Sequence, residues 1–144
     1  ERLLEKMVAE TGDSTDLRDW VACLVCSLTE HLHQLGNPTW YARFAAQALA
    51  DPAYQKIVVK DALASPALVR VVEGITRCLP DLPAAVVVER NIMARNLLMH
   101  TCADFERAFA EGDPVPRASW QAVGNGLIDA IVGLWRAPVT EPPQ

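Results

Sequence analysis

The sequence has few basic residues and no long uninterrupted apolar segment. Its 13 lysines and arginines are outnumbered by 18 aspartates and glutamates, which gives a formal net charge of −5. Nucleic-acid binding needs clustered Lys and Arg against the phosphates, so we do not expect this chain by itself to hold DNA or RNA. No apolar run approaches the roughly 18 residues of a membrane span, and the N-terminus lacks a signal-peptide pattern. These absences predict a cytoplasmic protein without membrane contact.

Cysteines and aromatic residues are also scarce. The four cysteines are too few and too dispersed for a secreted disulfide framework, so we expect reduced thiols. Aromatic residues make up only 6% of the chain, and the β-branched runs 57–59 and 86–88 lie inside segments with helical start signals. The sequence therefore predicts an all-α fold. Its 144 residues suit one domain over 1–137, and the proline-rich residues 138–144 are expected to form a flexible tail.

Proline dipeptides indicate where helices begin. Asn37-Pro38, Asp51-Pro52 and Ser65-Pro66 each place a capping side chain before a proline that suits the first helical position. With the apolar periodicity, these signals predict a bundle of about six to seven helices over residues 1–10, 15–35, 38–50, 52–63, 66–79, 83–111 and 117–136. Glu1 lies inside an already helical pattern and is not a Met, so we expect the chain to begin downstream of a missing segment.

The last helix is apolar on most sides. Between Arg117 and Arg136 the only charged residue is Asp129, and glycines interrupt the helix although each costs up to ~1 kcal/mol relative to alanine. Close approach of another helix over the glycines would offset this cost. Because one small domain is not expected to cover such a helix alone, the pattern predicts a subunit interface. Its residues would be Trp120, Val123, Gly124, Leu127, Ile128, Ile131 and Trp135.

Taken together, these segments resemble the C-terminal regulatory domain of the TetR family of bacterial transcription repressors. The resemblance is carried by Ser65-Pro66-Ala67-Leu68, by Leu79-Pro80-Asp81-Leu82-Pro83, by the stretch from Met93 to Arg107, and by the apolar final helix. Ten arginines against three lysines fit the actinobacterial style of such sequences. The likeness covers most of the chain, but it is a pattern of helix lengths and junctions and not a catalytic signature.

The resemblance implies a homodimer, a small-molecule effector and an absent DNA reader. Residues 1–10 would be the connecting helix that follows the family's helix-turn-helix domain, so DNA would be bound only through that missing domain. The two long C-terminal helices would form a dimeric four-helix bundle, to which helix 83–111 would contribute Leu98, Cys102 and Phe105. The other helices would enclose the effector.

Candidate effector-binding residues lie on three of the expected helices. His31 falls between Leu28 and Leu35 on an apolar stripe, where it could anchor a ligand or could be a core histidine bonded to a backbone carbonyl. A mostly apolar pocket would be completed by Trp40, Tyr41, Phe44, Gln47, Met93, Leu97 and His100. His100 and Asp104 share a helical face and could orient one another. An effector for such a pocket should be small and hydrophobic.

Metal and catalytic motifs are weak or missing. Cys23 and Cys26 form a C-x-x-C in mid-helix, but without a second such motif a closed tetrahedral site cannot be assembled locally. Glu30 and His33 match half of a di-iron motif, and His33 faces away from the apolar stripe. No nucleophile elbow or phosphate-binding loop occurs. We therefore expect no enzyme activity, no metal and no cofactor. The alternatives are a ligand-free protein–protein interaction module and, third, a helical carboxylate metalloprotein.

Overall fold

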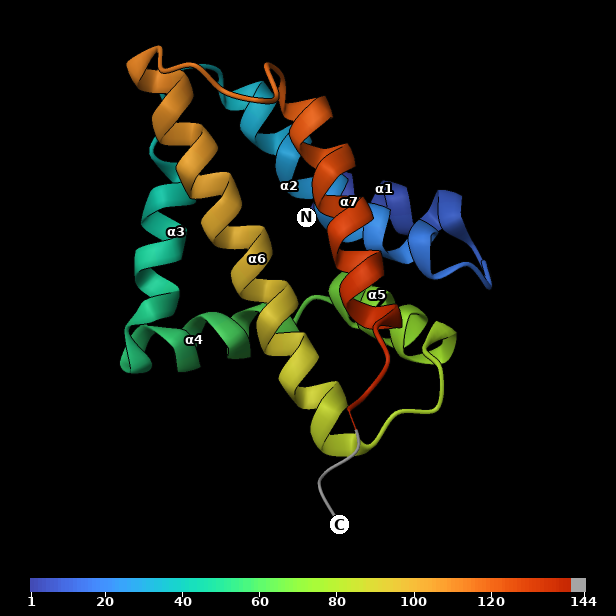
Figure 1. Ribbon diagram of the computed structural model, residues 1–144. Helices are drawn as coiled ribbons and strands as arrows, with labels where there is room; N and C mark the ends of the chain where they lie inside the picture. The colour runs from blue at the N-terminus through green and yellow to red at the C-terminus, as the bar shows by residue number, and fades with distance from the viewer. Residues whose placement is uncertain (141–144) are drawn as a thin grey trace.

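The computed structural model describes residues 1–140, which form a bundle of seven helices without strands (Figure 1). The helices are α1 (Arg2–Thr11), α2 (Leu17–Leu35), α3 (Tyr41–Ala50), α4 (Pro52–Leu63), α5 (Pro66–Cys78), α6 (Ala84–Glu111) and α7 (Trp120–Arg136). The all-α prediction is thus confirmed. Residues 138–140 follow α7 without regular structure, and the rest of the expected tail, 141–144, lies outside the described residues. Over residues 1–140, every helix is too short or too polar to span a bilayer.

Two of the three proline-marked helix starts are confirmed. The Asp51 carboxylate accepts a hydrogen bond from the backbone N–H of Ala53 at 2.9 Å, and the Ser65 hydroxyl accepts one from Leu68 at 3.3 Å. In both helices the proline follows the cap and occupies the first turn, where its missing N–H leaves no donor unpaired. Local sequence alone is sufficient to begin α4 and α5.

The third expected start, at Asn37-Pro38, is wrong. The Asn37 side-chain amide donates instead to the backbone carbonyl of Phe109 at 2.8 Å, and α3 begins only at Tyr41. Trp40, which precedes α3, provides no side-chain cap. The N–H groups at the start of α3 are instead bound by Glu106, a residue of α6. A contact distant in sequence therefore sets this boundary.

The core is centred on α2, which packs against α7 and α5. Trp20 is completely buried and donates from its indole nitrogen to the Ser14 carbonyl at 2.9 Å. Gly74 of α5 lies directly against the face of this indole. On the other side, Gly124 of α7 approaches Thr29 so closely that an added Cβ would stand 3.1 Å from its hydroxyl oxygen. The helices of this core therefore meet over glycines.

This packing corrects one sequence-based argument. We expected that a single small domain could not cover the last helix, but α2 covers it within one chain, as Figure 1 shows with α7 in front of α2. The seven predicted interface residues of α7 are all buried in this single chain. The apolar pattern of this helix correctly predicts that these residues are buried. It did not reveal that the covering helix belongs to the same chain.

The long helix α6 stands between α3 and α7 and contacts both (Figure 1). Its most buried residues recur at every fourth position: Arg90, Ala94, Leu98, Cys102 and Glu106. At one end of this row, the Arg90 guanidinium donates to the carbonyl of Trp135 at the end of α7, at 2.9 Å. At the other end, Glu106 binds α3. Helix α6 is therefore packed against two other helices of the same chain, α3 and α7.

Candidate functional site

A hollow of about 460 Å³ lies between α3 and α6. It is lined by four residues that the sequence proposed for effector binding, namely Trp40, Phe44, Gln47 and His100. Trp40 and Phe44 leave 67% and 73% of their surface exposed, although they are large apolar side chains. Because exposed aromatic groups beside a concavity are favourable contacts for a ligand, this hollow is the candidate effector site.

The buried carboxylate of Glu106 holds Arg43, one of the residues that line the hollow. Glu106 is 1% exposed, and its Oε2 accepts the backbone N–H of Ala42 at 2.9 Å. Its Oε1 accepts both the backbone N–H of Arg43, at 3.0 Å, and the guanidinium Nε of the same residue, at 3.1 Å. A negative charge at a helix N-terminus is favoured by the helix dipole and by the free N–H groups there. Glu106 therefore caps α3 from another helix.

The guanidinium of Arg43 links Glu106 to the aromatic residue Trp40. Besides its ion pair with Glu106, it donates to the Thr39 carbonyl at 2.7 Å and stands 3.5 Å from the centre of the Trp40 ring. This cation–π contact favours one orientation of an otherwise exposed indole. The Trp40 ring therefore has one contact within the protein that helps to position it beside the hollow.

The rim of the hollow carries charges of both signs. Asp104 and Arg107 line it together with His100. Arg107 is shared between Glu111, at 3.4 Å, and Asp113, at 3.8 Å. His100 and Asp104 line the same hollow. Within residues 1–140, however, no hydrogen bond joins their side chains, so the expectation that they orient one another stays a prediction. The hollow therefore offers the charged groups of Asp104 and Arg107 in addition to the polar side chains of His100 and Gln47.

The remaining predicted effector residues lie elsewhere. His31 and Tyr41 pack edge to face, with ring centroids 4.8 Å apart, and line a different hollow of about 330 Å³ beside α1. Met93 is 46% exposed on α6, and Leu97 packs against the core. The residues expected to line one pocket thus lie in at least two separate places. A role for these four residues in effector binding stays a prediction.

The residues expected at a dimer seam lie mostly inside the chain. Leu98 is 5% exposed, Cys102 is fully buried and Phe105 is half-buried, while the predicted residues of α7 are all buried. These side chains pack in the chain's own core. Dimerisation of two protein chains through these residues therefore remains a prediction.

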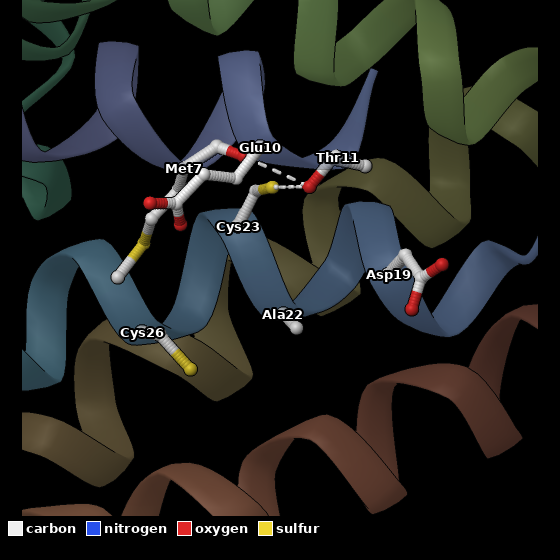
Figure 2. Close-up of a pocket in the computed structure, with 7 residues that line it drawn as sticks. All are labelled: Met7, Glu10, Thr11, Asp19, Ala22, Cys23 and Cys26. Atoms are coloured by element: carbon white, nitrogen blue, oxygen red, sulfur yellow. Dashed lines mark hydrogen bonds between the residues drawn. The ribbon is translucent and has the colours of Figure 1, made fainter. Parts of the chain in front are cut away.

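The C-x-x-C pair borders a hollow of about 380 Å³ between α1 and α2 (Figure 2). The Cys23 thiol lies 3.0 Å from the Thr11 hydroxyl, whereas Cys26 points in a different direction in Figure 2. Burial raises the pKa of both thiols, and the Thr11 hydrogen bond only partly offsets this for Cys23. Within residues 1–140, no group of three or more His, Cys, Asp or Glu side chains could hold a metal ion.

The thiol of Cys102 should resist alkylation in the folded protein. Burial, together with the charge of nearby Glu106, raises its pKa to about 12, so almost no reactive thiolate exists at pH 8. We expect mass spectrometry to find Cys102 unmodified after an iodoacetamide treatment that fully modifies it in guanidinium chloride. Rapid labelling of Cys102 in the native protein would contradict the buried position assigned here.

Sequence reasoning missed the central pair of the site, Glu106 and Arg43. One signal was present, because Glu106 follows Leu98 and Cys102 at four-residue intervals and therefore lies on a buried row. A charge on such a row needs a partner. No local pattern could identify that partner, since Arg43 lies far away in the sequence.

Comparison with known proteins agrees with this architecture. A family described as the tetracyclin repressor-like C-terminal domain matches residues 22–133, which includes α3, α6 and the hollow between them. No curated protein and no solved structure matches the chain.

Proposed function

Because this chain belongs to the tetracyclin repressor-like C-terminal domain family, we propose that it senses a small hydrophobic effector and dimerises, without catalysing a reaction. The effector would bind between α3 and α6 and alter DNA binding by a helix-turn-helix domain outside this sequence, in a bacterial cytoplasm. The observation that carries this proposal is the family match, and the exposed aromatic wall of Trp40 and Phe44 supports the location.

The contacts of α6 suggest how an effector would act. One end of α6 holds the start of α3 through Glu106, and the other holds the end of α7 through Arg90. A ligand between α3 and α6 that prefers one arrangement of these helices would shift the population toward it, by no more than its difference in affinity for the two arrangements. Because α6 is continuous over 28 residues, such a shift would reach α7.

Dimerisation is proposed through α6 and α7. The inner face of α7 is occupied by α2, so the outward face is the one open to a second copy. That face presents small residues, namely half-buried Gly126 and exposed Ala130 and Gly133, over which another helix could approach closely. The seam proposed here therefore lies on the opposite side of α7 from Gly124.

We expect the chain to sediment as a dimer at micromolar concentration. Ala130→Arg should weaken the dimer by at least about tenfold, because a buried arginine without a partner costs more than 1.4 kcal/mol. The matched control is Gln34→Arg, which adds the same charge at an exposed position on α2. A monomeric parent protein, or equal dimer affinity for both variants, would contradict the proposed seam.

A thermal-shift screen of small apolar and aromatic compounds tests effector binding. A compound present at about a hundred times its Kd should stabilise the parent by about 2.7 kcal/mol. Phe44→Ala should abolish this stabilisation. His31→Leu, which alters the separate hollow beside α1, should retain it.

If no compound stabilises the parent, the effector-sensing proposal is wrong. The second candidate, a protein–protein interaction module, would then be preferred, because the same exposure of Trp40 and Phe44 also suits a protein partner. Pull-down of a partner by the parent that Phe44→Ala abolishes would support this alternative.

A further inference from the structure

Helix α4 has no buried residue, which makes it unlike the other six helices of the described chain. Several large apolar side chains of α4 are exposed, among them Tyr54 at 59%, Ile57 at 64% and Leu63 at 58%. Between α4 and α6 runs an open groove of about 710 Å³, which we call the α4–α6 groove. Val59 and Leu63 of α4 and Ile92 of α6 supply its apolar surface. This groove is separate from the α3–α6 hollow and shares no lining residue with it.

The charged residues of the α4–α6 groove are all cations. Lys56, Lys60 and Arg95 line it, and no aspartate or glutamate does. None of these three cations takes part in the ion pairs of the described chain. In a protein with net charge −5, three unpaired cations beside an apolar surface are a local excess of positive charge.

The side chain of Arg95 gives a second, independent observation. Its Nε atom is buried and has no hydrogen-bond partner. Buried donors in folded proteins are nearly always paired, so an unpaired one needs a specific explanation. A guanidinium binds a carboxylate with particularly good geometry, and Arg95 would do so through its terminal N–H groups, because its Nε has almost no accessible surface.

From these observations we propose that the α4–α6 groove binds a medium-chain fatty acid. The carboxylate would accept hydrogen bonds from Arg95 and an ion-pair contact from Lys60, and the alkyl chain would cover Val59, Leu63 and Ile92. A neutral apolar compound would leave the cations without a partner, and a small inorganic anion would leave the apolar surface exposed. A single-chain amphiphile with one negative head group satisfies both requirements.

Isothermal titration calorimetry with decanoate, kept below its micelle concentration, tests this inference. We expect the 144-residue protein to bind decanoate. Butyrate should bind far more weakly, because its alkyl chain is too short to cover the apolar surface. Decyltrimethylammonium should not bind, because its head group is cationic. Arg95→Met and Lys60→Met should each weaken decanoate binding about tenfold, as expected for hydrogen bonds to a charged group. Lys6→Met is the matched control, since Lys6 is an exposed lysine on α1.

Any of the following results would overturn the inference. The parent protein could fail to bind decanoate, or could bind butyrate as tightly as decanoate. The Arg95→Met variant could bind decanoate as tightly as the parent does. The protein could also bind anionic lipid vesicles but not monomeric decanoate. A loss of decanoate binding in Phe44→Ala combined with its retention in Arg95→Met would place the fatty acid in the α3–α6 hollow instead, and would also overturn it.

Discussion

Replacing Glu106 by alanine should destabilise the domain by about 3–5 kcal/mol, which is a large part of the 5–15 kcal/mol typical of a folded domain. The change removes a carboxylate that is 1% exposed and accepts three hydrogen bonds. The N–H groups of Ala42 and Arg43 would lose their acceptor, and the largely buried Arg43 guanidinium would lose its counter-charge. Urea denaturation followed by far-UV circular dichroism measures the free energy of unfolding directly.

The control for this prediction is Glu111→Ala on the same helix. Glu111 pairs with Arg107, but both side chains are about half exposed, so solvent screens the interaction. Its removal should change the free energy of unfolding by less than about 1 kcal/mol. If Glu106→Ala and Glu111→Ala have equal effects, then Glu106 neither caps α3 nor holds Arg43 in place.

Gly74→Ala should destabilise the fold by about 3 kcal/mol or more, although alanine is the better helix former. A Cβ at this position would overlap the Cδ2, Cε2 and Cε3 atoms of the Trp20 indole. The indole cannot move aside easily, because it is fully buried and held by its hydrogen bond to the Ser14 carbonyl. Helix α5 would have to move away from α2, which would open the core.

A double-mutant cycle with Trp20→Leu isolates this contact. Trp20→Leu is itself destabilising, but it removes the ring that the new methyl group would overlap. In that background Gly74→Ala should be neutral or slightly stabilising, because only the gain in helix propensity remains. An equally large loss in both backgrounds would show that Gly74 is required for another reason.

Local sequence signals predicted which helices form. They did not predict a helix start that depends on a residue distant in the sequence. The starts of α4 and α5 were predictable because Asp51 and Ser65 bind N–H groups only two or three residues away. The start of α3 was not, because its cap comes from Glu106, and Asn37 is used by Phe109 instead. A capping pattern in sequence identifies a side chain that can cap a helix, while the tertiary structure decides whether it does.

The same limit applies to the candidate site. Helical periodicity put Phe44 and Gln47 on one helix, which the structure confirms for α3, while Trp40 lies just before that helix. All three line one hollow, and His100 lines it from α6. Periodicity could not tell that His31 would pair with Tyr41 beside α1. Likewise the apolar stripe of α7 predicted burial, but a second copy and α2 of the same chain would both satisfy it. Only the three-dimensional arrangement distinguishes these two partners.

The proposed function requires that an effector binds between α3 and α6. Amide and side-chain NMR shifts of the ¹⁵N-labelled domain, titrated with the most stabilising compound from the thermal-shift screen, test it most directly. The largest shifts should occur at the Trp40 indole N–H, the Gln47 side-chain amide and the backbone amides from His100 to Arg107. Shifts confined to the hollow beside α1 around His31 and Tyr41, with none between α3 and α6, would contradict it.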